Sequence, residues 1–255
     1  MKTRDFPILE FDPTPRAVIE PSEQITPSDV PERCVPCFFG DVIAGLVESG
    51  AARETACMKS EMGRHPIYVM EVGGSEVALY QPGISAAFAA AMLDEVIAHG
   101  CRKFVACGAA GVLDREIDAG HIIVPVSAVR DEGASYHYMA PSREVEADPA
   151  GVAAIESVLQ AHGRPYIKGK TWTTDAFYRE TPDKVALRRS EGCIAVEMEA
   201  AAFFAVARFR GVTFAQMLYG GDDVSGSEWD HREWHKRTSV REDLLMLAAE
   251  ACLLL

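Results

Sequence analysis

The chain of 255 residues is acidic, with 38 Asp and Glu against 25 Lys and Arg and a formal net charge of −13. This charge repels a polyphosphate backbone, so nucleic acid is not expected as a partner, although a small anion can bind in a local basic pocket. Hydrophobic residues make up 48% and charged residues 25%, which excludes disordered and fibrous classes. No stretch approaches the length of a membrane span and no signal-peptide core is visible, so we expect a cytoplasmic protein with no membrane partner.

The early part of the chain predicts an irregular arm followed by one domain. Residues 1–37 are rich in proline and show little periodicity, so we expect them to lie as an N-terminal arm on the body or on a neighbouring subunit. The seven cysteines are expected to stay reduced, and the lone pair Cys34 and Cys37 has no second pair that would support a zinc site. From Phe38 to residue 255, strand and helix signals alternate, which predicts a single α/β domain.

Hydrophobic periodicity predicts the elements of this domain in chain order. They are a helix at 42–46, a hairpin of strands 67–72 and 76–80 around Gly73-Gly74, a helix at 86–99, strands at 103–107 and 121–126, a helix at 149–161, a strand at 167–171, a helix starting at Pro182, a helix at 197–208, a strand at 213–218 and a helix at 240–254.

Small residues follow the predicted strand 103–107, in the run Gly108-Ala109-Ala110-Gly111. Small residues at the carboxyl edge of a sheet let a ligand approach the backbone, which is where α/β enzymes bind ligands. The run is not the dinucleotide fingerprint, and turns of small residues are common, so an ordinary turn is an equally good interpretation.

Two further segments carry carboxyl groups. Glu197 and Glu199 flank Met198, and in a helix they would point to nearly opposite sides, so at most one can face a pocket. A carboxylate suits a sugar because it accepts from adjacent hydroxyls, whereas acidic residues in a first helical turn are also favoured by the helix dipole. Asp222 and Asp223 follow Gly220-Gly221, where burial of a carboxyl pair would make one of them a proton donor, and where a solvated turn is the alternative.

These segments together resemble the nucleoside phosphorylase family in order and spacing, over about residues 38–255. The matching runs are residues 107–113 with Gly120, Asp131-Glu132-Gly133-Ala134-Ser135-Tyr136-His137, Thr174-Asp175-Ala176-Phe177-Tyr178, residues 196–201, and Gly221-Asp222. The resemblance is to the purine and uridine phosphorylases with the trimeric or hexameric architecture. The resemblance implies a three-layer α/β/α domain with a central mixed sheet, and cleavage of the bond between ribose and base.

The resemblance also implies residue roles. Glu199 would hold the ribose hydroxyls, Met198 would pack under the sugar, Phe177 would lie against the base, and Asp222 would protonate the leaving base, with Asp223 as second choice. Gly108, Ala109, Glu197 and His137 complete the expected substrate-binding set. Arg179-Glu180-Thr181-Pro182 stands where uridine phosphorylase reads uracil, which argues against a standard uracil site.

The phosphate site of the family is not reproduced. The family has an arginine before the glycine run and a serine or threonine within it, whereas this chain has Ala106 and Ala109, and no arginine follows Gly40-Asp41 closely. Phosphate needs charge-assisted donors. Either Lys59, Arg64 and Arg130 supply them, or water attacks as in the hydrolytic nucleosidases. Lys59 lies near where the family places an arginine that reaches into a neighbour's site.

We therefore expect a nucleoside phosphorylase that converts a purine or pyrimidine nucleoside and inorganic phosphate to base and (deoxy)ribose 1-phosphate, slightly ahead of a nucleosidase. No metal or organic cofactor is implied, and a homo-oligomer (dimer, trimer or hexamer) is expected. A non-catalytic storage-type member is a rival, opposed by the presence of Met198, Glu199 and Asp222 together. A dinucleotide-dependent oxidoreductase is opposed by the glycine spacing.

Overall fold

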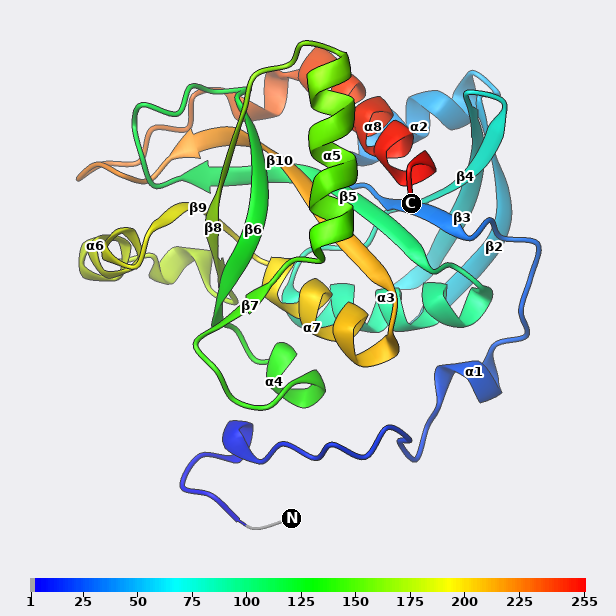
Figure 1. Ribbon diagram of the computed structural model, residues 1–255, viewed down its shortest axis with the longest axis horizontal. Coiled ribbons are helices and arrows are strands. Elements are labelled where there is room, and N and C mark those ends of the chain that lie inside the picture. The colour runs from blue at the N-terminus through cyan, green and yellow to red at the C-terminus, as the bar shows by residue number, and fades with distance from the viewer. Residues whose placement is uncertain (1–2) are drawn as a thin grey trace.

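A mixed ten-stranded sheet forms the centre of the computed structural model, which describes residues 3–255 apart from the side chain of His235 (Figure 1). The strands are β1 (Arg33–Pro36), β2 (Ala52–Ser60), β3 (Gly63–Val72), β4 (Ser75–Tyr80), β5 (Lys103–Val112), β6 (Ile122–Asp131), β7 (Glu144–Glu146), β8 (Tyr166–Thr174), β9 (Cys193–Glu197) and β10 (Thr213–Asp223). Nine of them follow the order β10-β6-β8-β9-β5-β1-β4-β3-β2, β7 pairs with β6 off this path, and β10 also pairs with β5. The strands β5, β9, β8, β6 and β10 therefore close into a ring.

Helices cover both faces of the sheet. They are α1 (Pro21–Gln24), α2 (Gly40–Glu48), α3 (Ala86–His99), α4 (Ser135–Tyr138), α5 (Pro149–Ala161), α6 (Pro182–Ser190), α7 (Ala200–Arg210) and α8 (Thr238–Leu253), with short 3-10 turns η1 (Pro7–Leu9), η2 (Phe177–Arg179) and η3 (Trp234–Lys236). Figure 1 shows α2, α5 and α8 on one side and α3 and α7 on the other. The predicted three-layer fold with a mixed sheet is confirmed.

The alternation of side chains along β5 explains why this strand lies between two helical layers. Phe104 and Ala106 belong to the core under α3 and α7, whereas Val105 and Cys107 belong to the core under α5 and α8. Successive residues of a strand point to opposite faces, so a strand buried on both faces is a continuous apolar run. The ring of Phe104 stacks on that of Phe214 in β10, with centroids 5.7 Å apart.

Several element boundaries differ from the prediction. The small residues Gly108 to Gly111 continue β5, because the first three pair with β10 and Gly111 pairs with β9, and the predicted turn is wrong. β10 likewise continues to Asp223. Glu197 ends β9 and the helix begins only at Ala200, so the two glutamates are not on a helix together. The helices at 86–99 and 149–161 are confirmed.

The domain begins earlier than the predicted boundary at Phe38. β1 lies in the sheet between β4 and β5, and Cys34 and Val35 are fully buried there. The rest of the predicted arm runs along the side of α3 and α4 (Figure 1), where Glu20 forms a 3.3 Å ion pair with Arg210 of α7. Residues 1 and 2 of the arm lie outside the described residues.

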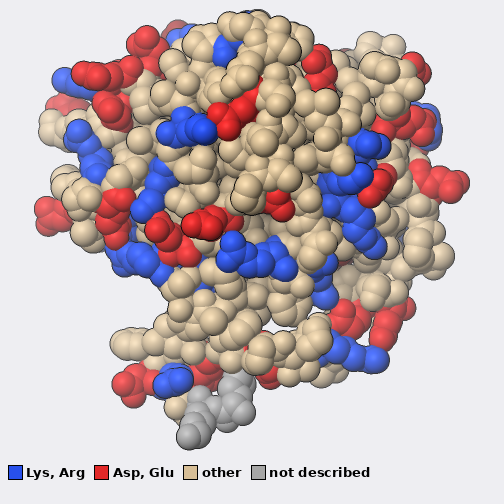
Figure 2. Space-filling model, in the orientation of Figure 1, with Lys and Arg blue, Asp and Glu red and all other residues tan. Residues whose placement is uncertain are grey.

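The surface carries both signs of charge. On the face drawn in Figure 2, Lys and Arg groups lie among Asp and Glu groups, so the acidic excess is not gathered into a single patch there. Across residues 3–255, no helix is long and apolar enough to cross a membrane.

Candidate active site

The ends of β5, β9 and β10 meet at one edge of the sheet and bring Asp222 next to the glutamate segment. Gly111 of β5 pairs with Val196 of β9, and Val112 pairs with Asp223 of β10. A Cβ atom on Gly111 would lie 3.1 Å from Val196 Cγ1 and 3.5 Å from Asp222 Oδ1. A glycine at this position therefore leaves the room that the Asp222 carboxyl occupies.

Glu197 is used entirely by the protein itself. Its Oε1 accepts hydrogen bonds from the hydroxyls of Thr171 (3.1 Å) and Thr173 (2.6 Å), and its Oε2 accepts from the backbone N–H groups of Glu199 (2.7 Å) and Ala200 (2.6 Å). These contacts fix the first turn of α7, where unpaired N–H groups favour a carboxylate. Burial raises the pKa of Glu197 despite these donors. Glu197 is therefore a positioning residue. Both of its carboxyl oxygens accept hydrogen bonds from the protein, in place of the predicted contact with substrate.

Glu199 accepts fewer hydrogen bonds from the protein than Glu197 does. Its side chain is buried, and Oε1 accepts from the backbone N–H of Ser85 at 2.7 Å. Burial raises the pKa of Glu199 to about 8, and the nearby charge of Glu197 adds to the effect. Ser85 has a φ of 103°, a backbone conformation that residues other than glycine rarely adopt. Residues with such a strained backbone are often found at functional sites. This strained residue, just before α3, aims its N–H at Glu199.

The aromatic candidate Phe177 lies in η2, directly after β8, and is 49% exposed. Its ring centroid is 4.1 Å from that of Tyr178, so the two rings form a small exposed aromatic surface. The end of β8 is joined to the loop after β6 because Gly133 N donates to Asp175 Oδ2 at 2.9 Å. Met198 is half-buried between the two glutamates.

Asp222 and Asp223 have different environments. Trp229 donates its Nε1–H to Asp222 Oδ2 at 2.6 Å. Asp223 is buried, with Oδ2 at 2.8 Å from Arg232 Nη2 and Oδ1 accepting from Ser225 N at 2.8 Å. Burial raises the pKa of Asp223, but the hydrogen bonds and the charge of Arg232 outweigh it, so the pKa is lowered. An ion-paired carboxylate with a low pKa is a poor acid, so Asp223 is the less suitable proton donor of the two.

Glu180 belongs to the segment that stands where uridine phosphorylase reads uracil, and no role of its own is predicted for it from the sequence. It follows η2, is half-buried, and has no hydrogen bond or ion pair to its carboxyl within residues 3–255. Burial raises its pKa to about 7, and the charge of Asp222 contributes. No local pattern in the sequence distinguishes it from other acidic loop residues, because its neighbour Asp222 lies on a distant strand.

Arg130 is not free to bind phosphate, which corrects the sequence-based prediction. Its Nε donates to Ser135 Oγ (2.8 Å), Nη1 donates to Ala140 O (2.7 Å) and Ser142 Oγ (2.8 Å), and Nη2 donates to Met139 O (3.0 Å). The guanidinium is buried and fastens the loop after β6.

Lys59 and Arg64 face each other across the β2–β3 hairpin and are exposed. Arg64 pairs with Glu54 Oε1 at 2.5 Å. Arg64 also lines a cleft of about 520 Å³ together with Gly40, His65, Gln81, Gly83 and Phe88. This cleft lies beside the start of α2 and reaches the chain segment that ends at Ser85, which binds Glu199.

The other expected substrate contacts differ in how accessible they are. Gly108 is buried under Phe38, whose Cδ2 would lie 3.0 Å from an added Cβ, so its backbone is not open to a ligand as predicted. Ala109 is half-buried and pairs with Tyr219. His137 is exposed on α4. Within residues 3–255, no three His, Cys, Asp or Glu side chains are grouped so that they could hold a metal ion.

Comparison with known proteins decides the family. Residues 32–253 match the family model described as the phosphorylase superfamily. The chain belongs to this superfamily. Among its relatives, guanosine phosphorylase of Halorubrum lacusprofundi is 25% identical over 72% of this chain and 84% of the relative. Uridine phosphorylase of Thermococcus kodakarensis is 29% identical over 56% of this chain and 55% of the relative.

Solved structures of superfamily members share the fold. Purine nucleoside phosphorylase from Toxoplasma gondii superposes with a TM-score of 0.74 at 19% identity, covering 88% of this chain and 91% of that one. AMP nucleosidase from Bacteroides thetaiotaomicron superposes with a TM-score of 0.70 at 22% identity, covering 88% and 87%. The fold is thus shared with proteins named as a phosphorylase and as a nucleosidase. The family match makes the chain an enzyme of the phosphorylase superfamily.

Proposed function

We propose that the protein cleaves the N-glycosidic bond of a nucleoside and transfers the sugar to inorganic phosphate, giving base and (deoxy)ribose 1-phosphate. The observation that carries the proposal is the buried carboxyl of Glu199, which has one oxygen fixed by Ser85 N at 2.7 Å. A carboxylate accepts from adjacent sugar hydroxyls, and in a buried site it stabilises the positive charge that develops on the sugar as the base leaves.

The leaving base needs a proton donor and a surface. Asp222 supplies the acid in this proposal, because its neighbour Asp223 is committed to Arg232 at 2.8 Å. The exposed ring of Phe177 supplies an apolar face on which a planar base can lie. Both residues lie at strand ends close in the fold to the segment of Glu199.

The cleft beside α2 is the part of the site that best suits phosphate. Its lining includes Arg64, His65 and Gly40, the first residue of α2. The N-terminus of α2 has no side-chain cap, and helix N-termini bind anions through their free N–H groups. The exposed pair of Arg64 with Glu54 contributes at most about 1 kcal/mol, so Arg64 can exchange Glu54 for phosphate at little cost.

Hydrolysis is the second candidate, and a specific observation favours it. Arg130 has its donors occupied by the loop that follows β6, and Ala106 and Ala109 offer no side-chain donors. A hydrolase needs only a bound water and gains nothing from phosphate.

The deciding experiment incubates the protein with a nucleoside panel, with and without phosphate, and identifies the sugar product. We expect phosphate to accelerate cleavage saturably and ribose 1-phosphate to form. Free ribose at the same rate without phosphate would reject phosphorolysis and support hydrolysis. Failure to cleave any nucleoside would reject both candidates.

Variants locate the phosphate. Arg64→Met is expected to raise the KM for phosphate at least tenfold while changing the KM for nucleoside little. Lys59→Met tests the other hairpin cation in the same assay. Arg53→Met is the matched control, because Arg53 also lies on the β2–β3 ladder, but pairs with Glu76 at 2.7 Å and does not line the cleft. Equal KM values for phosphate in the Arg64 and Arg53 variants would remove Arg64 from the site.

We further propose that the enzyme works in the cytoplasm as a homo-oligomer and without a metal or organic cofactor. Light scattering of the purified protein tests the oligomer, and activity after treatment with a chelator tests the independence from metal.

A further inference from the structure

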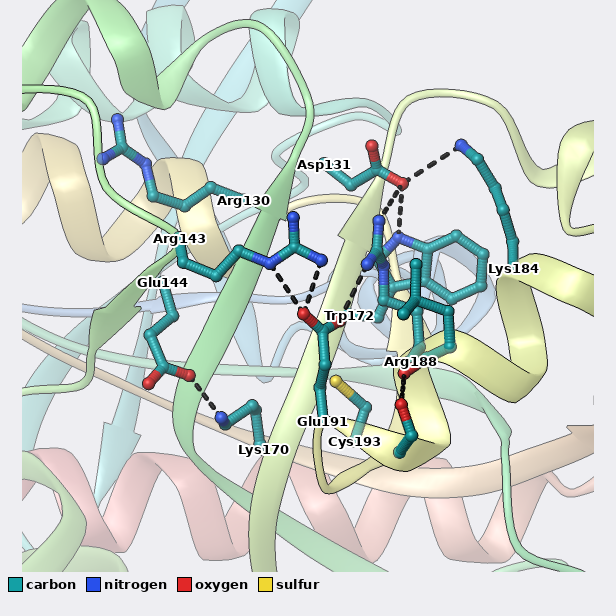
Figure 3. A network of polar contacts seen from close by, with 12 residues as sticks. Arg130, Asp131, Arg143, Glu144, Lys170, Trp172, Lys184, Arg188, Glu191 and Cys193 are labelled. Carbon is teal, nitrogen blue, oxygen red and sulfur yellow. Dashed lines mark hydrogen bonds and ion pairs between the residues drawn. The ribbon is translucent and has the colours of Figure 1, made fainter.

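The buried contact between Trp172 and Asp131 belongs to the framework of the fold. Trp172 of β8 is fully buried and donates its Nε1–H to Asp131 Oδ2 at 3.0 Å. Figure 3 shows that Lys184 and Arg188 of α6 donate to the same oxygen, at 3.2 Å and 3.1 Å. With three donors, two of them charged, this carboxylate is fully engaged in joining α6 to the sheet.

The contact between Trp229 and Asp222 is of a different kind. Trp229 is 64% exposed, and its Nε1–H donates to Asp222 Oδ2 at 2.6 Å. Within residues 3–255 the Asp222 carboxyl accepts no other hydrogen bond, so its Oδ1 is without a donor. Because an exposed ring adds little to the core, the main contribution of Trp229 is its N–H group.

The chain beside Trp229 is fastened to the end of β10. Asp223 and Asp230 exchange two backbone hydrogen bonds, of 2.8 Å and 3.1 Å. Arg232 donates to Asp223 Oδ2 at 2.8 Å. The indole of Trp229, one residue before Asp230, is therefore brought to Asp222 by a fixed backbone and not by burial of its ring.

This arrangement holds one oxygen of Asp222 and leaves the other free. A Cβ atom on Gly111 would lie 3.5 Å from Oδ1 and 3.7 Å from Oδ2, so the carboxyl lies over this glycine near the end of β5. A carboxyl that gives up a proton from one oxygen becomes negatively charged. An N–H donor on the other oxygen then binds more strongly, because hydrogen bonds to charged groups are about twice as strong as neutral ones. A contact that strengthens as a reaction proceeds raises the rate rather than the affinity.

We propose that Trp229 is a positioning residue for proton transfer to a leaving purine base, holding Oδ2 of Asp222 so that Oδ1 delivers the proton. The inference rests on the proposed nucleoside cleavage. The electron pair of the glycosidic bond moves onto the base as the bond breaks, and the base takes the proton from Oδ1. The indole N–H stabilises the carboxylate that remains, which regains a proton from the solvent before the next turnover.

The test uses two nucleosides that differ in their need for an acid, inosine and 7-methylinosine, at saturating phosphate. The methyl group gives the purine ring a positive charge, so this base leaves as a neutral molecule without taking up a proton. Trp229→Phe keeps an aromatic ring but removes the donor, and should lower kcat for inosine by about tenfold or more. It should lower kcat for 7-methylinosine by about threefold at most. Glu228→Gln, in the same exposed loop, is the control and should leave both rates unchanged.

Action through Asp222 has a second consequence. The Asp222→Asn enzyme has no proton to transfer, so adding Trp229→Phe to it should change kcat for inosine by about twofold at most. Equal slowing of both substrates by Trp229→Phe, or full additivity with Asp222→Asn, overturns the inference, because the ring then acts on the loop and not on the proton transfer. A folded Trp229→Phe enzyme with the wild-type rate for inosine overturns it as well, and so does a wild-type enzyme that cleaves pyrimidine but not purine nucleosides.

A measurement without catalysis tests the contact itself. In protein made with isotope-labelled tryptophan, the indole N–H signal of Trp229 in the nuclear magnetic resonance spectrum is the one that Trp229→Phe lacks. Asp222→Asn should move this signal more than that of Trp172, whose donor is bound to Asp131. An unmoved Trp229 signal rejects the inference whatever the kinetics show. Absence of any nucleoside cleavage would instead reject the proposed function.

Discussion

Replacing Glu199 by glutamine is expected to stabilise the ligand-free protein at alkaline pH while removing its activity. Burial, with the charge of Glu197, raises the pKa of Glu199 from its ordinary 4.5 to about 8. Between these two values the folded protein keeps a proton that the unfolded chain releases. The contribution of Glu199 to stability is therefore complete below pH 4.5 and is lost as the pH rises toward 8.

The size of this effect follows from the two pKa values. One pKa unit corresponds to about 1.4 kcal/mol, and linkage between pKa values of 4.5 and about 8 gives a loss of about 3.5 kcal/mol between pH 5 and pH 8. Glutamine does not titrate but still offers an oxygen to Ser85 N. The free energy of unfolding of the variant, minus that of the wild type, should therefore rise by about this amount over the same range.

The assay is urea unfolding of both proteins at pH 5, 6, 7 and 8. Other groups with raised pKa values, such as Glu180, are present in both proteins and cancel in the difference. Asp183→Asn is the control, and its difference from wild type should stay flat. Turnover of the identified nucleoside should fall about a hundredfold in the Glu199 variant, which corresponds to about 3 kcal/mol of transition-state stabilisation. A flat difference for Glu199→Gln between pH 5 and pH 8, or wild-type turnover, would refute the reasoning.

Two other substitutions separate catalytic from structural groups. Asp222→Asn should lower turnover of 6-oxopurine nucleosides at least a hundredfold with little loss of stability. Asp223→Asn should instead lower the free energy of unfolding by about 2 kcal/mol, because it removes the charge-assisted hydrogen bond of 2.8 Å to the half-buried Arg232. Kinetics and urea unfolding measure both, and a folded but inactive Asp223 variant beside an active Asp222 variant would exchange the assignments. Arg130→Met should lower the free energy of unfolding by about 3 kcal/mol and leave the KM for phosphate unchanged, since its donors serve the protein alone. A raised KM for phosphate without loss of stability would return Arg130 to the phosphate site.

Periodicity identified the helices at 86–99 and 149–161 and the strand 103–107 because each buries a regular face. It failed where local residues do not decide the structure. The glycines and alanines at 108–111 are typical of a turn, but pairing with β10 extends the strand through them. β1 is only four residues long and follows a proline-rich segment, so nothing local separates it from the arm.

The site was harder to predict than the fold because partners come from distant segments. The acidic segment singled out Glu199 as a candidate, but its hydrogen bond comes from Ser85, which is 114 residues away in the chain. Glu197 accepts from the free N–H groups at the start of α7. This role can be recognised only once the helix is known to start at Ala200. Arg130 is a plausible phosphate ligand by charge, but the carbonyls of Met139 and Ala140 take its donors.

The raised pKa of Glu199 also bears on how the proposed reaction is driven. In the ligand-free protein at neutral pH the carboxyl is mainly protonated, because burial, and after it the nearby charge of Glu197, disfavours the ionised form. Positive charge on the sugar reverses this preference, since two opposite charges about 4 Å apart attract by about 4 kcal/mol at the effective dielectric of a protein site. The ionised form is thus favoured most when the bond to the base is breaking, and an interaction that strengthens toward the transition state raises the rate rather than the affinity for substrate. The same carboxyl that weakens the empty fold is therefore the one best suited to support bond cleavage.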